Sequence, residues 1–185
     1  MKKVLLVHGF EGSPNGGWRP WLMAELEKQD IYACALPMPN PAEPICEEWV
    51  GELERYVDAN SNDEIYLVGH SLGTPAILRY LELPNAPKIS GAVLVSGPID
   101  IVLNKKISSF LDKEFDFKTI KTKADKFCVI HGDNDPNVPL DNAEKLAKEL
   151  ECELIVVKNG GHLNGSIGWT KLPHALEALN RMFEK

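Results

Sequence analysis

The stretch IYLVGHSLGTP, residues 65–75, joins an apolar run to a helix-compatible pattern through a serine that has a glycine two residues before it and another two residues after it. Residues 69–73, GHSLG, match the G-x-S-x-G pattern, in which the serine sits on a tight strand-to-helix turn. The two glycines let the neighbouring strand and helix pack against the turn without clashing Cβ atoms. Chance matches to five residues are common, but the strand-like run before Ser71 and the helical pattern after it favour a nucleophile elbow.

Strand-like and helix-like patterns alternate along the rest of the chain. Six short runs rich in Val, Ile and Leu begin at Lys2, Ile31, Glu64, Ser90, Lys126 and Cys152. Most are apolar at consecutive positions, which is typical of strands covered on both faces. Helical stripes lie at residues 18–26, 49–57, 77–81, 143–150 and 172–183. This order predicts an α/β fold with a parallel sheet and helices on both faces, in one domain over residues 1–185.

One connection differs from the others. Residues 97–125 form a longer segment with only a weak helical pattern from Ile101 to Leu111. We interpret this segment as room for a small cap over a site.

Composition limits the possible partners and the compartment. Lys and Arg total 20 against 27 for Asp and Glu, a net charge of −7, which argues against nucleic acid or an anionic membrane as the main partner. The N-terminal stretch MKKVLLVHGF has a short apolar run and no small-residue cleavage site after it, and no apolar run is long enough to span a membrane. We therefore predict a buried first strand in a cytoplasmic protein.

The four cysteines show no C-x-x-C pairing, and three of them lie in apolar runs. They are Cys34, Cys46, Cys128 and Cys152. This pattern predicts buried reduced thiols and argues against a disulfide framework or a zinc site.

A serine nucleophile requires a base and an orienting carboxylate, which in this architecture follow in the order serine, acid, histidine. The segment HGDNDPNVP, residues 131–139, follows the fifth strand-like run, and NGGHLNG, residues 159–165, follows the sixth. Ligands of open α/β sheets bind outside the carboxyl ends of the strands. All three candidate groups fall at such ends, so their convergence carries more weight than any one motif.

The acid is open between Asp133, Asp135 and Asp100. Asp135 is favoured because it lies further from its strand, where a loop can bring a carboxylate toward His162; the alternative is that Asp133 and Asp135 only form turns. His162 is the favoured base because it follows two glycines after the last strand. Less suited are His8, His70, His131 and His174.

The oxyanion formed during acyl transfer requires preorganised N–H donors. One is expected to be the backbone amide of Leu72, directly after the nucleophile. The other is expected to be the amide of Phe10 in HGFEGSPNGGW, residues 8–18, if the first and third strands flank the topological switch point. This segment lacks both the G-x-G-x-x-G spacing and a Walker lysine, so nucleotide binding is its weaker use. Phe10 and Trp169 are the aromatic residues that we suspect of lining a pocket.

Five stretches in this order resemble one family over essentially the whole chain: LVHGFEGSPNGGWRPWL, LPMPNP, LVGHSLGT, HGDNDPNVP and GGHLNG. The chain is similar to the small, nearly lidless α/β-hydrolases of the retinoblastoma-binding-protein-9 and YdeN type. The resemblance implies six parallel strands in the order 2-1-3-4-5-6, without the usual first antiparallel hairpin. It also implies a triad of Ser71, Asp135 and His162 in a serine hydrolase of undefined substrate. The retinoblastoma contact does not carry over, because LECEL, residues 150–154, lacks the final glutamate of an L-x-C-x-E motif.

Two functional hypotheses follow. The first is a metal-free, cofactor-free serine hydrolase that cleaves a small-molecule ester, thioester or activated amide through an acyl-enzyme. The alternative is a protein-binding module with a vestigial site and an unspecified protein partner, since fold alone does not establish function. An exposed apolar patch and no reaction with acyl-site probes would favour the alternative. Acyl transfer to another acceptor and peptidase action use the same machinery and stay open.

Overall fold

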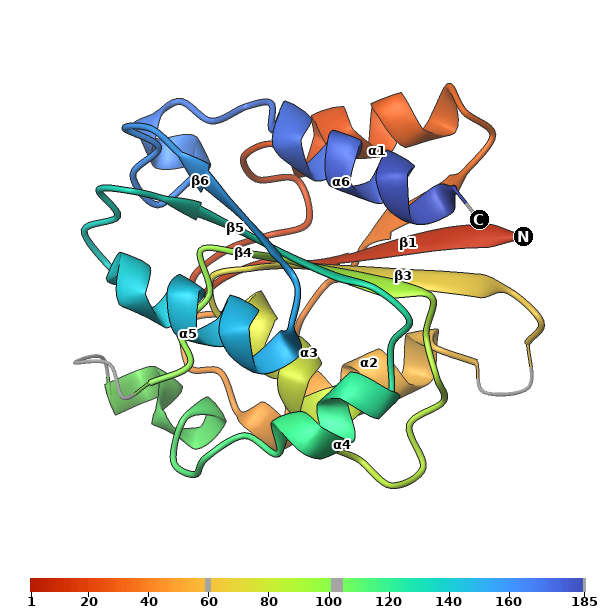
Figure 1. Cartoon of the computed structure of the whole chain (residues 1–185), viewed down its shortest axis with the longest axis horizontal. Coiled ribbons are helices and arrows are strands. Elements are labelled where there is room, and N and C mark those ends of the chain that lie inside the picture. The colour runs from red at the N-terminus through yellow and green to blue at the C-terminus, as the bar shows by residue number, and fades with distance from the viewer. Residues whose placement is uncertain (59–60, 101–104, 185) are drawn as a thin grey trace.

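The computed structural model describes residues 1–58, 61–100 and 105–184, and its six strands form one parallel sheet (Figure 1). The strands are β1 (Lys2–Val7), β2 (Tyr32–Ala35), β3 (Glu64–His70), β4 (Gly91–Val95), β5 (Phe127–Gly132) and β6 (Glu153–Val157). Their order is β2-β1-β3-β4-β5-β6, which confirms the order that the family resemblance implied. Val7 pairs with Gly69, so β1 and β3 end side by side at the point where the strand order reverses.

Helices cover both faces of the sheet, as predicted. The helices α1 (Arg19–Glu27) and α6 (Pro173–Phe183) lie on one face, and α2 (Cys46–Tyr56), α3 (Gly73–Leu81), α4 (Phe117–Thr122) and α5 (Leu140–Leu150) lie on the other (Figure 1). Both helices of the first group carry a proline in the first turn, where a missing N–H leaves no hydrogen bond unmade.

The central strand β3 shows why its sequence is apolar at consecutive positions. Leu67 points into the core under α2 and α3, and Val68 points into the core under α1 and α6; neither has any exposed surface. A strand covered on both faces buries successive side chains on opposite sides. The consecutive apolar residues in the sequence therefore indicate the helices on both faces of the sheet as well as the strands.

The long connection from Gly97 to Asp125 extends the core beside α2 and α3. It contains α4 and the 3₁₀ helix η1 (Lys105–Phe110), and Phe110 packs edge-on against Trp49 with ring centroids 5.5 Å apart. Residues 101–104 of the weak helical pattern lie outside the described residues. No described residue of this connection lines the cavity around Ser71, so the part seen here does not form the cap that we expected.

The structure also bears on the expectations about membrane-spanning segments and cysteines. Within residues 1–58, 61–100 and 105–184, no helix is both long and apolar enough to cross a bilayer. All four cysteines are unpaired, but Cys128 alone among them is fully buried. The prediction of buried thiols was wrong for the other three, which are half-buried because they lie at the sheet margins or at a helix start.

Candidate active site

The predicted elbow is present at the carboxyl end of β3. Ser71 has φ +52°, a strained conformation for a residue with a side chain, and its N–H donates to the carbonyl oxygen of Val95 at 2.8 Å. A Cβ on Gly69 would lie 2.7 Å from the carbonyl oxygen of Gly73, and a Cβ on Gly73 would overlap the carbonyl oxygen of Val7. The two glycines thus permit the close approach of β3, α3 and β1 that lifts Ser71 above the sheet.

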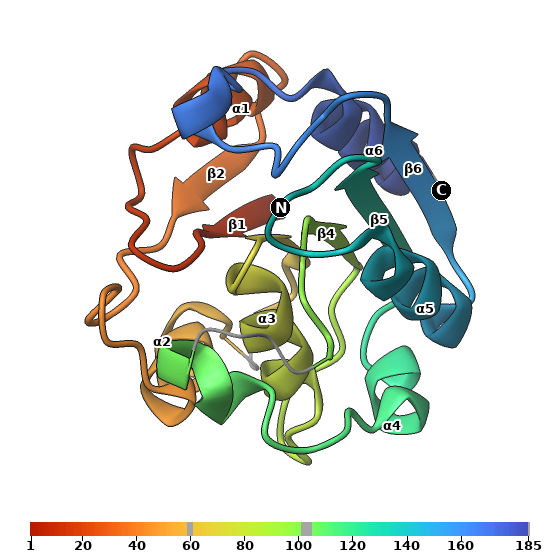
Figure 2. The same cartoon turned by 90° about the vertical axis from the view of Figure 1, so that its left-hand side faces the viewer.

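A hydrogen-bonded chain connects three loops at this end of the sheet, which faces the viewer in Figure 2. The Oγ of Ser71 donates to Nε2 of His162 at 2.9 Å, and Nδ1–H of His162 donates to Oδ2 of Asp135 at 2.7 Å. The side chain of Asp135 is completely buried, and that of His162 is 9% exposed. The three sequence candidates, far apart in the chain, therefore meet in the geometry of a nucleophile, a base and an orienting acid.

Asp135 is held as a carboxylate. Its Oδ1 accepts hydrogen bonds from the amides of Asn137 at 2.8 Å and Val138 at 3.0 Å. Burial alone would raise the pKa of Asp135, but the hydrogen bond from His162, its positive charge when protonated and these two amides outweigh burial and keep the pKa below its ordinary value. The ring of His131 donates to the carbonyl of Val138 at 2.9 Å and lies 3.5 Å from Oδ2 of Asp135, which fixes the loop.

The competing acids are engaged elsewhere. Oδ1 of Asp133 accepts from the amide of Asn159 at 2.7 Å, and Asp100 forms a surface ion pair with Lys145 at 2.6 Å. Asp133 thus braces the loop that carries His162, a role close to the turn-forming alternative. Of the three acids left open by the sequence, Asp135 is the one that contacts His162.

His70 contributes a contact that the sequence interpretation missed. Its Nε2–H donates to the carbonyl oxygen of His162 at 2.9 Å, and the two rings lie 5.2 Å apart. Burial, together with the charge of the neighbouring His162, lowers the pKa of His70 to about 3, so the ring is a neutral donor. Nothing in the sequence beyond its place next to Ser71 signals this contact, because its partner lies 92 residues away.

The loop after β1 lies against the nucleophile. A Cβ on Gly9 would be 2.9 Å from Cβ of Ser71, so the loop reaches Ser71 only because position 9 has no side chain. Across the described part of the chain, neither the N–H of Phe10 nor that of Leu72 donates a hydrogen bond to protein. Both amides are therefore without a protein acceptor in this part of the chain.

These loops enclose a cavity of about 480 Å³. Its lining includes Phe10, Ser13, Arg19, Ser71, His162 and Ser166. In its wall the loops after β1 and β6 meet at two glycines, since a Cβ on Gly165 would lie 2.9 Å from Cα of Gly17. Trp169, which we suspected of lining the pocket, is not in the lining; its indole N–H donates to the carbonyl of Gly160 at 2.9 Å and supports the histidine loop.

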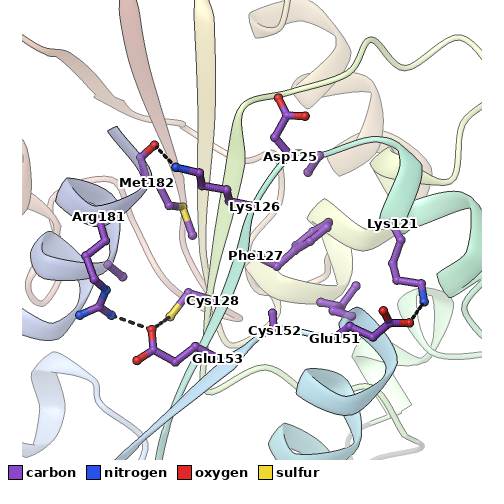
Figure 3. A pocket seen from close by; sticks show the side chains of 13 residues that line it. Lys121, Asp125, Lys126, Phe127, Cys128, Glu151, Cys152, Glu153, Arg181 and Met182 are labelled. Atoms are coloured by element: carbon purple, nitrogen blue, oxygen red, sulfur yellow. Dashed lines mark hydrogen bonds and ion pairs between the residues drawn. The ribbon is translucent and has the colours of Figure 1, made fainter. Parts of the chain in front are cut away.

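A second cavity of about 440 Å³ lies at the amino ends of β5 and β6 (Figure 3). Two of its cations pair with glutamates: Arg181 with Glu153 at 2.8 Å, and Lys121 with Glu151. The ammonium of Lys126 instead donates to the carbonyl oxygens of Met182 at 3.1 Å and Glu184 at 2.6 Å. Burial, together with the charge of the nearby Glu153, raises the pKa of the Cys128 thiol to about 12. No side chain here forms the arrangement of nucleophile and base seen around Ser71.

Comparisons with known proteins agree with this geometry. A family model described as serine hydrolase matches residues 4–181. YdeN of Bacillus subtilis is 35% identical over 186 residues, which cover 100% of this chain and 97% of YdeN. Serine hydrolase RBBP9 of Rattus norvegicus is 23% identical over 169 residues, which cover 89% of this chain and 88% of RBBP9.

Solved structures extend the comparison. The crystal structure of the ydeN gene product from B. subtilis superposes with a TM-score of 0.94 and 34% identity, with both chains covered completely. Est1E of Butyrivibrio proteoclasticus, at 13% identity and a TM-score of 0.78 over 100% of this chain and 89% of its own, shares the fold. The family model matches nearly the whole chain, and YdeN is similar over the full length of the chain. The chain therefore belongs to the serine hydrolase family.

Proposed function

We propose that Ser71, His162 and Asp135 form a catalytic triad that cleaves a small ester, thioester or activated amide through an acyl-enzyme. One observation carries the proposal: an unbroken hydrogen-bonded chain runs from the hydroxyl of a serine with positive φ through an imidazole to a buried carboxylate. This is the arrangement that converts a weak hydroxyl nucleophile into a reactive one.

In the proposed mechanism each group has one step. Oγ of Ser71 attacks the acyl carbon while its proton passes to Nε2 of His162, and Asp135 stabilises the imidazolium and holds the Nδ1–H tautomer. The amides of Phe10 and Leu72 stabilise the oxyanion, a contribution of about 2.7–4 kcal/mol for a single donor. His162 then protonates the leaving group, and water attacks the acyl-enzyme with His162 as base, which releases the acid and restores Ser71.

The cavity supports a substrate of modest size. Its volume of about 480 Å³ falls in the lower part of the usual range for small-molecule sites. It is bounded by the short loops after β1 and β6, with the nucleophile and base on one wall. We therefore propose hydrolysis of small acyl compounds, with water as the acceptor.

The test is intact-mass spectrometry after exposure to a fluorophosphonate probe. The parent should gain one adduct, and Ser71→Ala should gain none and should lose on the order of 10⁴-fold or more in kcat/KM toward p-nitrophenyl acetate. Ser96→Ala is a matched control, because Ser96 also follows a strand with positive φ, +47°, but its hydroxyl has no partner within the described residues. A folded parent without an adduct would contradict the proposal and favour the protein-binding module.

A further inference from the structure

Arg19 is a buried cation in the wall of the cavity that contains Ser71. It is the first residue of α1 and is only 6% exposed, although a guanidinium stays charged in proteins. Its Nε and Nη2 both donate to one acceptor, the carbonyl oxygen of Ser13, at 3.1 and 2.8 Å. Within the described ranges, no carboxylate pairs with Arg19 and its Nη1 donates no hydrogen bond to protein.

A second buried arginine shows how this fold satisfies a guanidinium that serves structure. Arg79 in α3 is 5% exposed and pairs with Glu82 at 2.9 Å. It also donates to the carbonyl oxygens of Phe110 at 3.0 Å and Glu114 at 3.2 Å, and to that of Lys113. The charge of Arg79 is thus matched by a carboxylate, whereas the guanidinium of Arg19 has, of the residues that the structure describes, besides the carbonyl of Ser13 only the ring of Trp18, whose centroid lies 5.9 Å away.

Burying an unmatched cation costs free energy that the folded protein must supply from other interactions. Burial lowers the pKa of Arg19 to about 10, so it remains charged at neutral pH. The chain also makes room for the group: a Cβ on Gly16 would lie 2.7 Å from Nη2. A buried charge that lowers stability, has N–H groups without a protein acceptor and lies in the wall of the cavity that contains the nucleophile is typical of a ligand-binding group.

The surroundings favour an anion of low charge. Ser13 and Ser166 add polar groups to the lining, and Arg19 supplies its cationic charge. Glu11 also lines the cavity, but it is exposed to solvent, where its repulsion of an anion is screened. Around the cavity of Figure 3, Arg181 and Lys121 are paired with glutamates, and the exposed ammonium of Lys126 donates to two backbone carbonyl oxygens, so these groups do not call for a ligand.

We propose that the substrate carries a carboxylate, on its acyl portion or its leaving group, and that Arg19 binds this carboxylate while the scissile carbonyl lies at Ser71. The proposal rests on the hydrolase function proposed above and names its substrate class. A guanidinium matches a carboxylate in charge and in planar geometry. A dianionic phosphate would keep an excess negative charge beside Glu11.

The test compares kcat/KM for matched esters that differ in one carboxylate: monomethyl succinate against methyl butyrate for the acyl side, and 4-acetoxybenzoate against phenyl acetate for the leaving group. The parent should prefer the anionic member of at least one pair by about tenfold to hundredfold, the range for a charge-assisted hydrogen bond. Arg19→Gln should remove this preference, and Arg19→Lys should keep part of it. Arg55→Gln removes a charge from an arginine side chain that is 79% exposed on α2 and should keep the parent's ratio.

Gly16→Ala provides a second variant that keeps the charge and displaces the guanidinium; it should also lower the preference. Equal kcat/KM within both pairs, or a preference that survives Arg19→Gln, would overturn the inference about the carboxylate. Hydrolysis of neutral esters that depends on Ser71 would, in that case, still support the hydrolase proposal. Stronger competitive inhibition by inorganic phosphate than by succinate would overturn the assignment of a carboxylate. Absence of both hydrolysis and the fluorophosphonate adduct would overturn the hydrolase proposal and this inference with it.

Discussion

The two ends of the sheet carry cavities of similar volume, about 480 Å³ at the carboxyl ends of the strands and about 440 Å³ at the amino ends of β5 and β6. At the amino ends, Arg181 and Glu153 neutralise each other, and the Cys128 thiol is kept protonated. At the carboxyl ends, Ser71 is aligned with a base, and Arg19 has no carboxylate partner in the described part of the chain. Volume therefore does not distinguish the two cavities; the hydrogen-bonded alignment at Ser71 and a buried guanidinium without a carboxylate partner among the described residues do.

Backbone strain is concentrated in the same way. Non-glycine residues with positive φ in the loops after strand ends include Glu11, Ser71, Ser96 and Asn159, whereas the lining of the amino-end cavity contains Glu151, a helix C-cap. Such conformations persist where the surrounding structure enforces them, and they occur often at functional sites. The strained loops place side chains that a regular strand or helix could not aim at one point.

After that of Ser71→Ala, the largest loss of activity is expected for Asp135→Asn. The amide cannot stabilise the imidazolium and favours the wrong tautomer of His162, so kcat should fall by about 10³–10⁴-fold in a p-nitrophenyl acetate assay. Asp133→Asn is the matched control, because an amide oxygen still accepts the hydrogen bond from Asn159. Equal losses in the two variants would mean that the loop matters only as a brace.

The second expected effect is a difference in the free energy of unfolding between glycine replacements at the two ends of the sheet. In Gly73→Ala the new methyl group would overlap the backbone carbonyl of Val7, and we expect a loss of about 2–3 kcal/mol in the free energy of unfolding. Gly91→Ala, near the amino-end cavity, meets the flexible thioether of Met182 first, at 2.8 Å, and should cost about 1 kcal/mol. Urea titrations measure both values, and the reverse order would show that the elbow can relax.

A smaller effect concerns pH and stability. The pKa of Asp135 is lower in the folded protein than the ordinary value of 3.8, so its ionised form contributes stability above pH 3.8 that is lost as pH falls through the folded pKa. Asp135→Asn should therefore be less stable than the parent by about 1–2 kcal/mol at neutral pH, and this difference should shrink in acid. Asp100→Asn, which breaks an exposed pair, should cost less than about 1 kcal/mol. A difference that grows in acid would contradict the assignment of the charge.

The smallest expected effect is at the amino end. Because the Cys128 thiol is buried and protonated, iodoacetamide should not modify it in the folded protein at neutral pH, and Cys128→Ala should change kcat/KM by less than about twofold. Peptide mapping after alkylation of the native protein checks this point. Rapid modification of Cys128, at a rate comparable to that of the fluorophosphonate with Ser71, would remove the contrast between the two ends.

Much of the fold and of the proposed triad could be predicted from the sequence because local signals agreed. Leu67 and Val68 show the two-faced burial of β3, and the loops with Asp135 and His162 follow their strands in the expected order. The role of Arg19 could not be predicted, since an arginine at a helix start is usually exposed and its burial depends on how the loop at Ser13 folds back. The pattern from Ile101 to Leu111, which contains η1, was only weakly helical because six residues of 3₁₀ helix lack the 3.6-residue period that marks an α-helix.

The contact of Gly17 with Gly165 has a consequence for how this site can diversify. The wall there is built from two positions without side chains, in the lining of the cavity that contains Ser71. A single methyl group at position 165 would meet the backbone of Gly17, push the two loops apart and reshape the pocket. Selection for new substrates can thus act on this contact between loops, and a library of substitutions at position 165 offers a compact route to altered selectivity, whereas position 17 has φ +58° and disfavours any side chain.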